Sequence, residues 1–216
     1  MTVTLHPVIY YRSKSEDWND AWQQHDWIAL NLVRAVKHKP FNGSSRIVFK
    51  GGRVVVIDSS DGGRDRALSL MCGELAKKIA EAGYEQALIV PIPASDHTNP
   101  ARPFTGSRIA AGIQAKDPSF VATPALYFSE PIPKSSAGGG RDAALIQSKL
   151  RDQGTIPAGT TVVLIDDVFT TGAHIKAAAR YLRAKGITVS DAFVVARTRW
   201  ERPPHMLKAA DEELAF

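Results

Sequence analysis

The sequence has a single cysteine and no long apolar segment, and each of these absences excludes a class of protein. Cys72 alone cannot form an internal disulfide or a multi-cysteine metal site, and its largely apolar surroundings predict a buried thiol. No apolar run approaches the roughly 20 residues that span a bilayer, and the first residues lack the basic and apolar regions of a signal peptide. We therefore expect a cytoplasmic protein without a membrane partner.

The common nucleotide-binding and metal motifs are also absent. The 216 residues contain no Gly-x-Gly-x-x-Gly, no Walker loop and no His/Cys cluster with metal-ligand spacing. The net charge is +5 and the isoelectric point is about 9.4, but the basic residues are spread without a run that resembles a nucleic-acid arm. This excess favours an anionic, phosphate-rich small molecule over nucleic acid, which stays open as a partner.

What the sequence does contain is an alternation of strand-like and helix-like segments. Uniformly apolar runs, typical of parallel strands buried on both faces, occupy 86–93 and 161–165. Further strand-like segments are 7–11, 53–58, 121–128 and 191–198. Helical patterns occupy 66–83, 105–115, 142–154 and the segment that ends at Lys185.

This order of segments predicts an α/β fold in which a parallel β-sheet is flanked by helices. We expect a single domain over 1–216, with an N-terminal elaboration (about 1–58), an α/β core (about 59–200) and a polar tail (201–216). Trp18, Trp22, Ile28 and Leu32 recur near helical spacing. Such an aromatic stripe is usually core or subunit contact, so a homodimer stays open.

The stretch "TVVLIDDVFTTGAHI", residues 161–175, carries most of the chemistry. Its apolar run would deliver Asp166 and Asp167 to the carboxyl edge of the sheet, where ligands of parallel sheets bind. The following Thr170, Thr171 and Gly172 open a helix whose first amides lack internal partners and favour a phosphate. Capping alone could explain one acid or one threonine, but the combination predicts a site for a sugar and its phosphate.

The segment "VVLIDDVFTTG" closely resembles the phosphoribosyl pyrophosphate signature of the type I phosphoribosyltransferases. The resemblance implies that Asp166 and Asp167 are the catalytic acids that hold the ribose hydroxyls. It implies that the 5-phosphate is bound by Val168, Phe169, Thr170, Thr171, Gly172, Ala173 and His174. It further implies Mg²⁺ bound mainly through phosphoribosyl pyrophosphate, and an N-terminal hood over the core.

Two positions depart from the family's pattern. His174 stands where Thr or Ser is common, and as a donor to phosphate it would weaken binding with rising pH. Thr170 stands where 6-oxopurine enzymes that resemble this motif carry an aspartate, which disfavours a hypoxanthine or guanine acceptor. A looser resemblance of "PIP…RPF" to the competence-associated branch leaves that subfamily open.

The remaining parts of the site are predicted from position in the chain. Donors for pyrophosphate after the strand at 86–93 are Ser95, Arg102 and Arg108. The segment "PKSSAGGGRD" predicts a mobile lid with Lys134 and Arg141 at its ends, and Trp200 is a weak candidate for the base pocket. His25, His38, His97 and His205 lack ligand spacing and are expected at the surface.

The resemblance thus implies an enzyme, a phosphoribosyltransferase that passes ribose 5-phosphate to an unidentified nitrogenous base and releases pyrophosphate. A non-catalytic sensor of nucleotides or phosphoribosyl pyrophosphate, or a protein associated with competence and nucleic acid, is the alternative.

Overall fold

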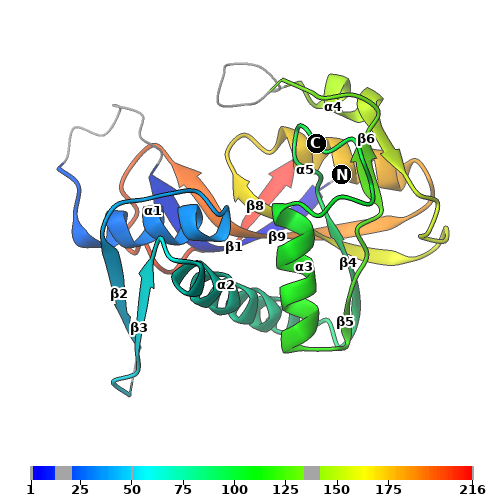
Figure 1. Cartoon of the computed structure of the whole chain (residues 1–216). Helices are drawn as coiled ribbons and strands as arrows, with labels where there is room; N and C mark the ends of the chain where they lie inside the picture. Colours follow the sequence, from blue (N-terminus) through cyan, green and yellow to red (C-terminus); the bar gives the residue numbers. More distant parts are fainter. Residues whose placement is uncertain (1, 13–20, 50, 134–141, 216) are drawn as a thin grey trace.

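A six-stranded sheet forms the centre of the computed structural model, which describes residues 2–12, 21–49, 51–133 and 142–215 (Figure 1). The strand order is β10–β1–β9–β8–β4–β5; β10 is antiparallel to β1, and the other neighbours are parallel. In that order the strands span Glu212–Ala215, Thr2–Arg12, Thr188–Arg199, Thr161–Phe169, Ala87–Pro91 and Phe120–Ala122. This mostly parallel sheet, flanked by helices, confirms the expected fold class.

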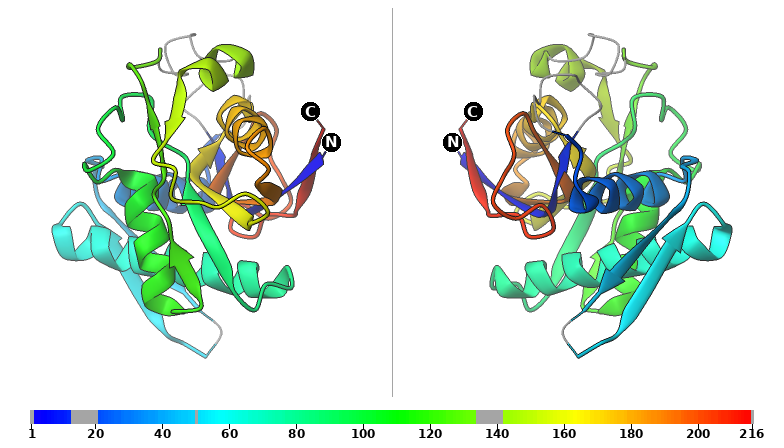
Figure 2. Two further views of the ribbon diagram at one scale, coloured as in Figure 1. Left: turned by 90° about the vertical axis from the view of Figure 1, so that its right-hand side faces the viewer. Right: turned by 90° about the vertical axis from the view of Figure 1, so that its left-hand side faces the viewer.

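Helices cover both faces of the sheet (Figures 1 and 2). One face carries α1 (Gln24–Val36), α2 (Asp61–Glu81) and α3 (Thr105–Lys116), and the other carries α4 (Ala143–Lys149) and α5 (Ala173–Arg183). Along β8, Val163 and Ile165 enter the first layer while Val162 and Leu164 enter the second. The apolar run is therefore buried on both sides, as its composition predicts.

Two small antiparallel ribbons complete the fold. β2 (Ser44–Val48) and β3 (Val54–Asp58) form a hairpin that extends from the body beside α1 (Figure 1), and β6 (Leu126–Phe128) pairs with β7 (Leu150–Asp152). The sequence patterns did not predict β2 or β7. In the described part of the chain, no helix combines the length and apolar character needed to cross a bilayer.

Both ends of the chain differ from the expected division. β1 lies inside the central sheet, paired with β9 along most of its length, so residues 2–12 are not part of a separate elaboration. The segment expected as a polar tail (201–216) contributes β10, which pairs with the first residues of β1. The Tyr10 amide donates to the Met206 carbonyl at 2.8 Å, and the Ala209 amide donates to the Val8 carbonyl at 3.1 Å.

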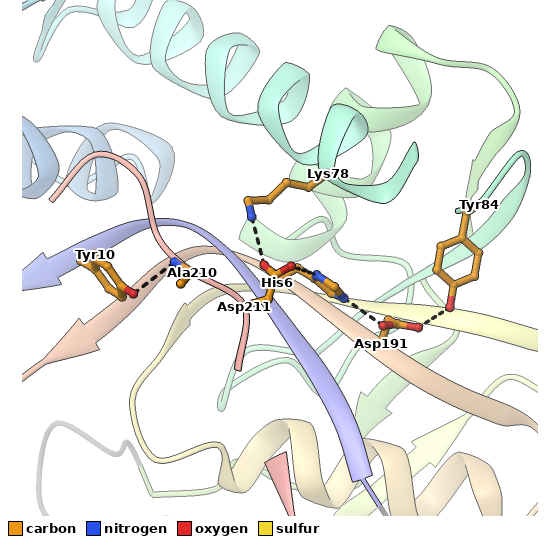
Figure 3. Close-up of polar contacts among 7 residues, drawn as sticks. All are labelled: His6, Tyr10, Lys78, Tyr84, Asp191, Ala210 and Asp211. Carbon is orange, nitrogen blue, oxygen red and sulfur yellow. Dashed lines mark hydrogen bonds and ion pairs between the residues drawn. The ribbon is translucent and has the colours of Figure 1, made fainter. Parts of the chain in front are cut away.

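A polar network around His6 fastens this C-terminal segment to the sheet and to α2 (Figure 3). The His6 Nε2 atom lies 2.9 Å from Asp191 Oδ1, and Nδ1 lies 2.9 Å from Asp211 Oδ2. Lys78 on α2 reaches Asp211 at 3.1 Å, and the Tyr84 hydroxyl donates to Asp191. Because both ring nitrogens face carboxylate oxygens, the network requires the doubly protonated imidazolium.

The charges of the network set its titration. Burial lowers the pKa of His6, but the hydrogen bonds and charges of Asp191 and Asp211 outweigh burial, and the pKa is raised. Burial raises the pKa values of Asp191 and Asp211, but their hydrogen bonds outweigh it and both pKa values are lowered. The folded state therefore holds the proton on His6 more tightly than the unfolded chain does.

We expect His6→Gln to lower the melting temperature by roughly 3–8 °C near pH 6 and by much less near pH 9. The stabilisation by His6 is complete below the unfolded pKa of 6.5 and is lost as the pH rises through the raised folded value. Thermal melts from pH 5 to 9 test this, with exposed His205→Gln as the control. An equal loss at pH 6 and pH 9 would contradict a charged His6.

Candidate functional site

Strand β8 delivers both acidic residues to the carboxyl edge of the parallel strands. The strand continues to Phe169, four residues beyond the predicted apolar run, so Asp166 and Asp167 lie in the C-terminal half of the strand. Asp166 is paired in register with Val194 of β9, and both acids are partly buried. They are neither turned into the apolar interior nor fully solvated, a position that suits contact with a ligand.

Lys37 contacts Asp167 and was not predicted from the sequence. It caps the C-terminal end of α1, and its Nζ lies 3.0 Å from each carboxylate oxygen of Asp167. Burial lowers the pKa of Lys37, but the nearby Asp167 outweighs burial and the pKa is raised. The two residues are 130 positions apart, and a basic residue after a helix is common. No local signal therefore distinguishes Lys37.

The two acids differ in their surroundings. Asp166 Oδ1 accepts the Asp167 amide at 2.8 Å. Burial, followed by the neighbouring charge of Asp167, raises the pKa of Asp166 to about 8, although this hydrogen bond and Lys37 oppose the rise. The pair therefore presents one ion-paired carboxylate beside one that is held towards its neutral form, so it can both accept hydrogen bonds from hydroxyls and donate one.

The turn after β8 is held by the end of β9. The Arg197 guanidinium stacks over the Phe169 ring at 4.6 Å, and its Nη1 donates to the Thr170 carbonyl at 3.0 Å. The hydroxyls of Thr170 and Thr198 lie 3.2 Å apart. Sequence reasoning predicted the threonines of the turn, but it missed the two residues from β9 that hold it.

Gly172 allows the chain to enter α5. Its φ is +79°, and a Cβ atom there would lie 2.6 Å from Cε2 of Phe169. The first helical bond runs from the Lys176 amide to the Gly172 carbonyl at 2.8 Å, so the preceding amides have no partner within the helix. The first turn of α5 has no acidic residue, and Thr171 is exposed. The helix start is therefore suited to an anion.

His174 lies in the first turn of α5, and its ring is partly buried. Among the described residues, its Nε2 is one of the buried nitrogens without a hydrogen-bond partner, and its ring meets the Phe128 ring edge-on at 6.3 Å. Burial lowers the pKa of His174 despite the opposing charge of Asp167. Burial therefore favours the neutral ring, and the contact of His174 with phosphate stays a prediction.

The loop from β4 to α3 is packed more closely than predicted. The Ser95 carbonyl accepts the Ile132 amide at 2.8 Å, and His97 is only 5% exposed with its ring 4.2 Å from that of Phe104. The expectation that His97 lies at the surface is therefore wrong. Arg102 is exposed.

Basic residues converge where α1 ends and where α2 and α3 begin. Arg108 lies in the first turn of α3, and its charge and that of Arg64 in α2 both act with burial to lower the pKa of His38. Burial also lowers the pKa of Arg108. His38 follows Lys37 directly, with a φ of +51° that is unusual for a residue other than glycine. Arg64 and Arg108 therefore lie near the end of α1 that carries Lys37, where the charges of Asp61 and Asp65 partly oppose theirs at His38.

Three predicted residues remain. Trp200 follows β9 directly and is 46% exposed. Lys134 and Arg141 lie outside the described residues.

Comparison with known proteins gives structural neighbours only. No family model matches the sequence, and no curated protein matches it. Orotate phosphoribosyltransferase from Aeropyrum pernix is 20% identical, with a TM-score of 0.43 over 79% of this chain and 81% of that one. Adenine phosphoribosyltransferase from Saccharomyces cerevisiae is 14% identical, with a TM-score of 0.42 over 78% and 89%. UMP synthase from Leishmania donovani is 20% identical, with a TM-score of 0.41 over 79% and 31%.

We expect Gly172→Ala to destabilise the protein more than Gly159→Ala. Gly159 has a similar φ of +82° but no atom within 4 Å of an added Cβ, so the two variants share the backbone strain and differ in the Phe169 contact. The strain should cost about 1 kcal/mol in both, and the contact should add to it in Gly172→Ala. Chemical denaturation measures the difference, and equal losses would contradict the close packing of Phe169 on the turn.

We expect Asp166→Asn to raise the melting temperature at pH 8 and to leave it unchanged near pH 4. Burial raises the folded pKa from 3.8, so the cost of ionising Asp166 is absent in acid and grows as the pH rises towards 8. Each kcal/mol relieved corresponds to about 2–4 °C. Asp167→Asn is the matched control and should lower stability, because it removes the partner of Lys37. A lower melting temperature for Asp166→Asn at pH 8 would contradict the raised pKa.

Proposed function

We propose that this protein is a phosphoribosyltransferase that binds Mg²⁺–phosphoribosyl pyrophosphate and transfers ribose 5-phosphate to a nitrogenous base. One observation supports this more than any other. A single segment, β8 with its turn and α5, carries two partly buried carboxylates directly before a helix start that has no acidic residue. A ribose 5-phosphate likewise carries hydroxyls and a phosphate within one small molecule.

In this proposal the acidic pair binds the ribose. Asp167, held by Lys37, accepts hydrogen bonds from a hydroxyl, and Lys37 keeps the carboxylate oriented between turnovers. Asp166 can accept or donate, because its raised pKa makes the protonated form accessible near neutral pH. Positioning by two fixed groups orients the anomeric carbon for the reaction.

The 5-phosphate would lie over the turn and the start of α5. Backbone amides from Thr171 to Ile175 and the exposed Thr171 hydroxyl supply donors, and the positive end of the helix dipole favours the charge. Arg197 fixes the turn through the Thr170 carbonyl. Val168 and Phe169 contribute packing beneath the turn in this proposal, since their side chains join the apolar clusters.

The pyrophosphate would lie towards the basic surface where the first turns of α2 and α3 approach the end of α1. Arg108 is the main donor in this proposal, Arg64 adds positive charge nearby, and His38, whose pKa is lowered, would contribute a neutral hydrogen-bonding ring. Ser95 and Arg102 stay candidates on the loop before α3. Separate positive surfaces for the two phosphate groups would hold the sugar between them.

During transfer, the bond from ribose C1 to the pyrophosphate oxygen breaks, and pyrophosphate leaves with the electron pair. A nitrogen of the base forms the new bond to C1, and the proton of that nitrogen is released. The Asp167 carboxylate, together with Asp166 when Asp166 is ionised, stabilises the positive charge that develops on the sugar. A magnesium ion that arrives with phosphoribosyl pyrophosphate would be held mainly by oxygens of the ribose and the pyrophosphate, and its charge would offset that of the leaving group.

Pyrophosphate release tests the proposal. The protein is incubated with phosphoribosyl pyrophosphate, Mg²⁺ and a panel of purine and pyrimidine bases, and the products are measured for each base. The double variant Asp166→Asn with Asp167→Asn should lose on the order of 100-fold or more of the activity while it keeps its fold. Exposed Glu81→Gln on α2 is the control and should retain full activity.

Calorimetric titration separates the outcomes. Binding of phosphoribosyl pyrophosphate without pyrophosphate release for any base would indicate a non-catalytic sensor. Full activity in the double variant, or no binding at all, would overturn the assignment of the acidic pair.

A further inference from the structure

A cavity lies between α1 and the start of β2, elements that are adjacent in Figure 1. Its volume is about 410 Å³, within the range of small-molecule sites. The residues that matter for its chemistry are Trp27, Asn31, Asn42, Ser45 and Arg46. The sequence analysis did not predict this cavity, and it is not part of the proposed transferase site.

The cavity is separated from the acidic pair along α1. It is lined by the first two turns of the helix, whereas Lys37 contacts Asp167 at the opposite end. With a rise of 1.5 Å per residue, Lys37 lies about 9 Å beyond Asn31 and about 15 Å beyond Trp27 along the helix axis. A ligand in this cavity would therefore not be the sugar held by Asp166 and Asp167.

The floor of the cavity is polar although it is buried. Asn31 is 7% exposed and Ser45 is 4% exposed, and the Asn31 amide donates to the Ser45 hydroxyl oxygen at 3.0 Å. This bond uses one of the four hydrogen-bonding positions of the asparagine amide and leaves the serine its own hydrogen to donate. Buried amide and hydroxyl groups that line a cavity provide both donors and acceptors for a polar ligand edge.

The wall of the cavity is aromatic. Trp27 is 48% exposed, and its ring lies 4.6 Å from that of Trp22, at an angle of 35°. The neighbouring ring restricts the orientation of Trp27, and its exposed surface faces solvent at a cavity with a polar floor. This arrangement suits a flat heterocycle. Every nucleobase has a face that can stack on an aromatic side chain, so such stacking does not depend on which base is bound.

The rim of the cavity carries positive charge. Arg46 is exposed on β2, and none of the described residues that line the cavity is acidic. Asn42 adds an exposed amide at the same rim. A ligand with an anionic group next to its flat ring is therefore favoured.

We propose that this cavity binds a nucleobase with its adjoining phosphate, as in a nucleoside 5′-monophosphate or one unit of a single strand. The base stacks on Trp27, its polar edge meets Asn31 and Ser45, and the phosphate lies at Arg46. Amide side chains match the donor and acceptor pairs on base edges. The site does not depend on transferase activity.

Titration with AMP, GMP, CMP and UMP, without Mg²⁺ or phosphoribosyl pyrophosphate, tests the proposal by calorimetry. Trp27→Ala should weaken binding about ten-fold or more, and Trp27→Phe should retain most of it. Leu145→Ala on α4 is the control, because Leu145 is also a large exposed apolar residue (44%) and lies outside both the cavity and the proposed transferase site. Arg46→Ala should weaken binding of the monophosphate but not of the nucleoside, with Arg53→Ala on the same hairpin as its control.

A nucleotide could also enter the transferase site, so variants of the transferase site are used to decide which of the two sites binds it. Binding in the cavity should persist in the double variant Asp166→Asn with Asp167→Asn and in Gly172→Ala. Loss in those variants, with no change in Trp27→Ala, would overturn the proposal.

An eight-residue deoxyadenosine oligonucleotide, titrated at 50 and 200 mM salt, distinguishes the two sources of the ligand. Tight, salt-sensitive binding of the oligonucleotide that depends on Trp27 would identify a strand, and tighter binding of the monophosphate would identify the free nucleotide. Absence of saturable binding for all of these probes would also overturn the proposal.

Discussion

The burial of β8 on both faces determines where polar chemistry can occur in this molecule. Val162 to Ile165 fill two apolar layers in alternation, so a charged residue in that stretch would have no water and no partner. Polar residues become tolerable only where the strand passes beyond the helices that cover it. Asp166 and Asp167 lie at that transition. The turn and helix α5 follow directly, so the same strand also determines where they lie.

The acidic pair is then made unequal by a contact from another part of the chain. The C-terminal end of α1 presents Lys37 to one acid. The other acid, beside it and shielded from solvent, keeps its proton to a higher pH. Two chemically identical side chains thereby acquire different properties, as is common where groups cooperate at a functional site. Burial of a carboxyl group destabilises the folded state, and the two apolar layers that pack on β8 offset this cost.

The local features of the site were predictable from sequence, and the distant ones were not. The apolar run, the two acids and the glycine of the turn are neighbours in the chain, so spacing alone predicts their arrangement. Lys37 and Arg197 reach the site from α1 and β9, and nothing in their own surroundings indicates this contact. β10 was missed for a similar reason, because a strand of four residues with two glutamates becomes regular only through pairing with β1. His97 was placed at the surface because polarity was weighed without its aromatic neighbour Phe104.

The pairing of the two chain ends has a further consequence. β1 would otherwise be the outermost strand, with a row of backbone groups open to pairing with another molecule. Residues 206–215 cover that row, first through the Met206 and Ala209 contacts and then through β10. At the opposite side of the sheet the last strand, β5, has only three residues and offers little to pair with. Shortening the chain by its final ten residues would uncover a template for aggregation while it left every proposed ligand-binding residue in place.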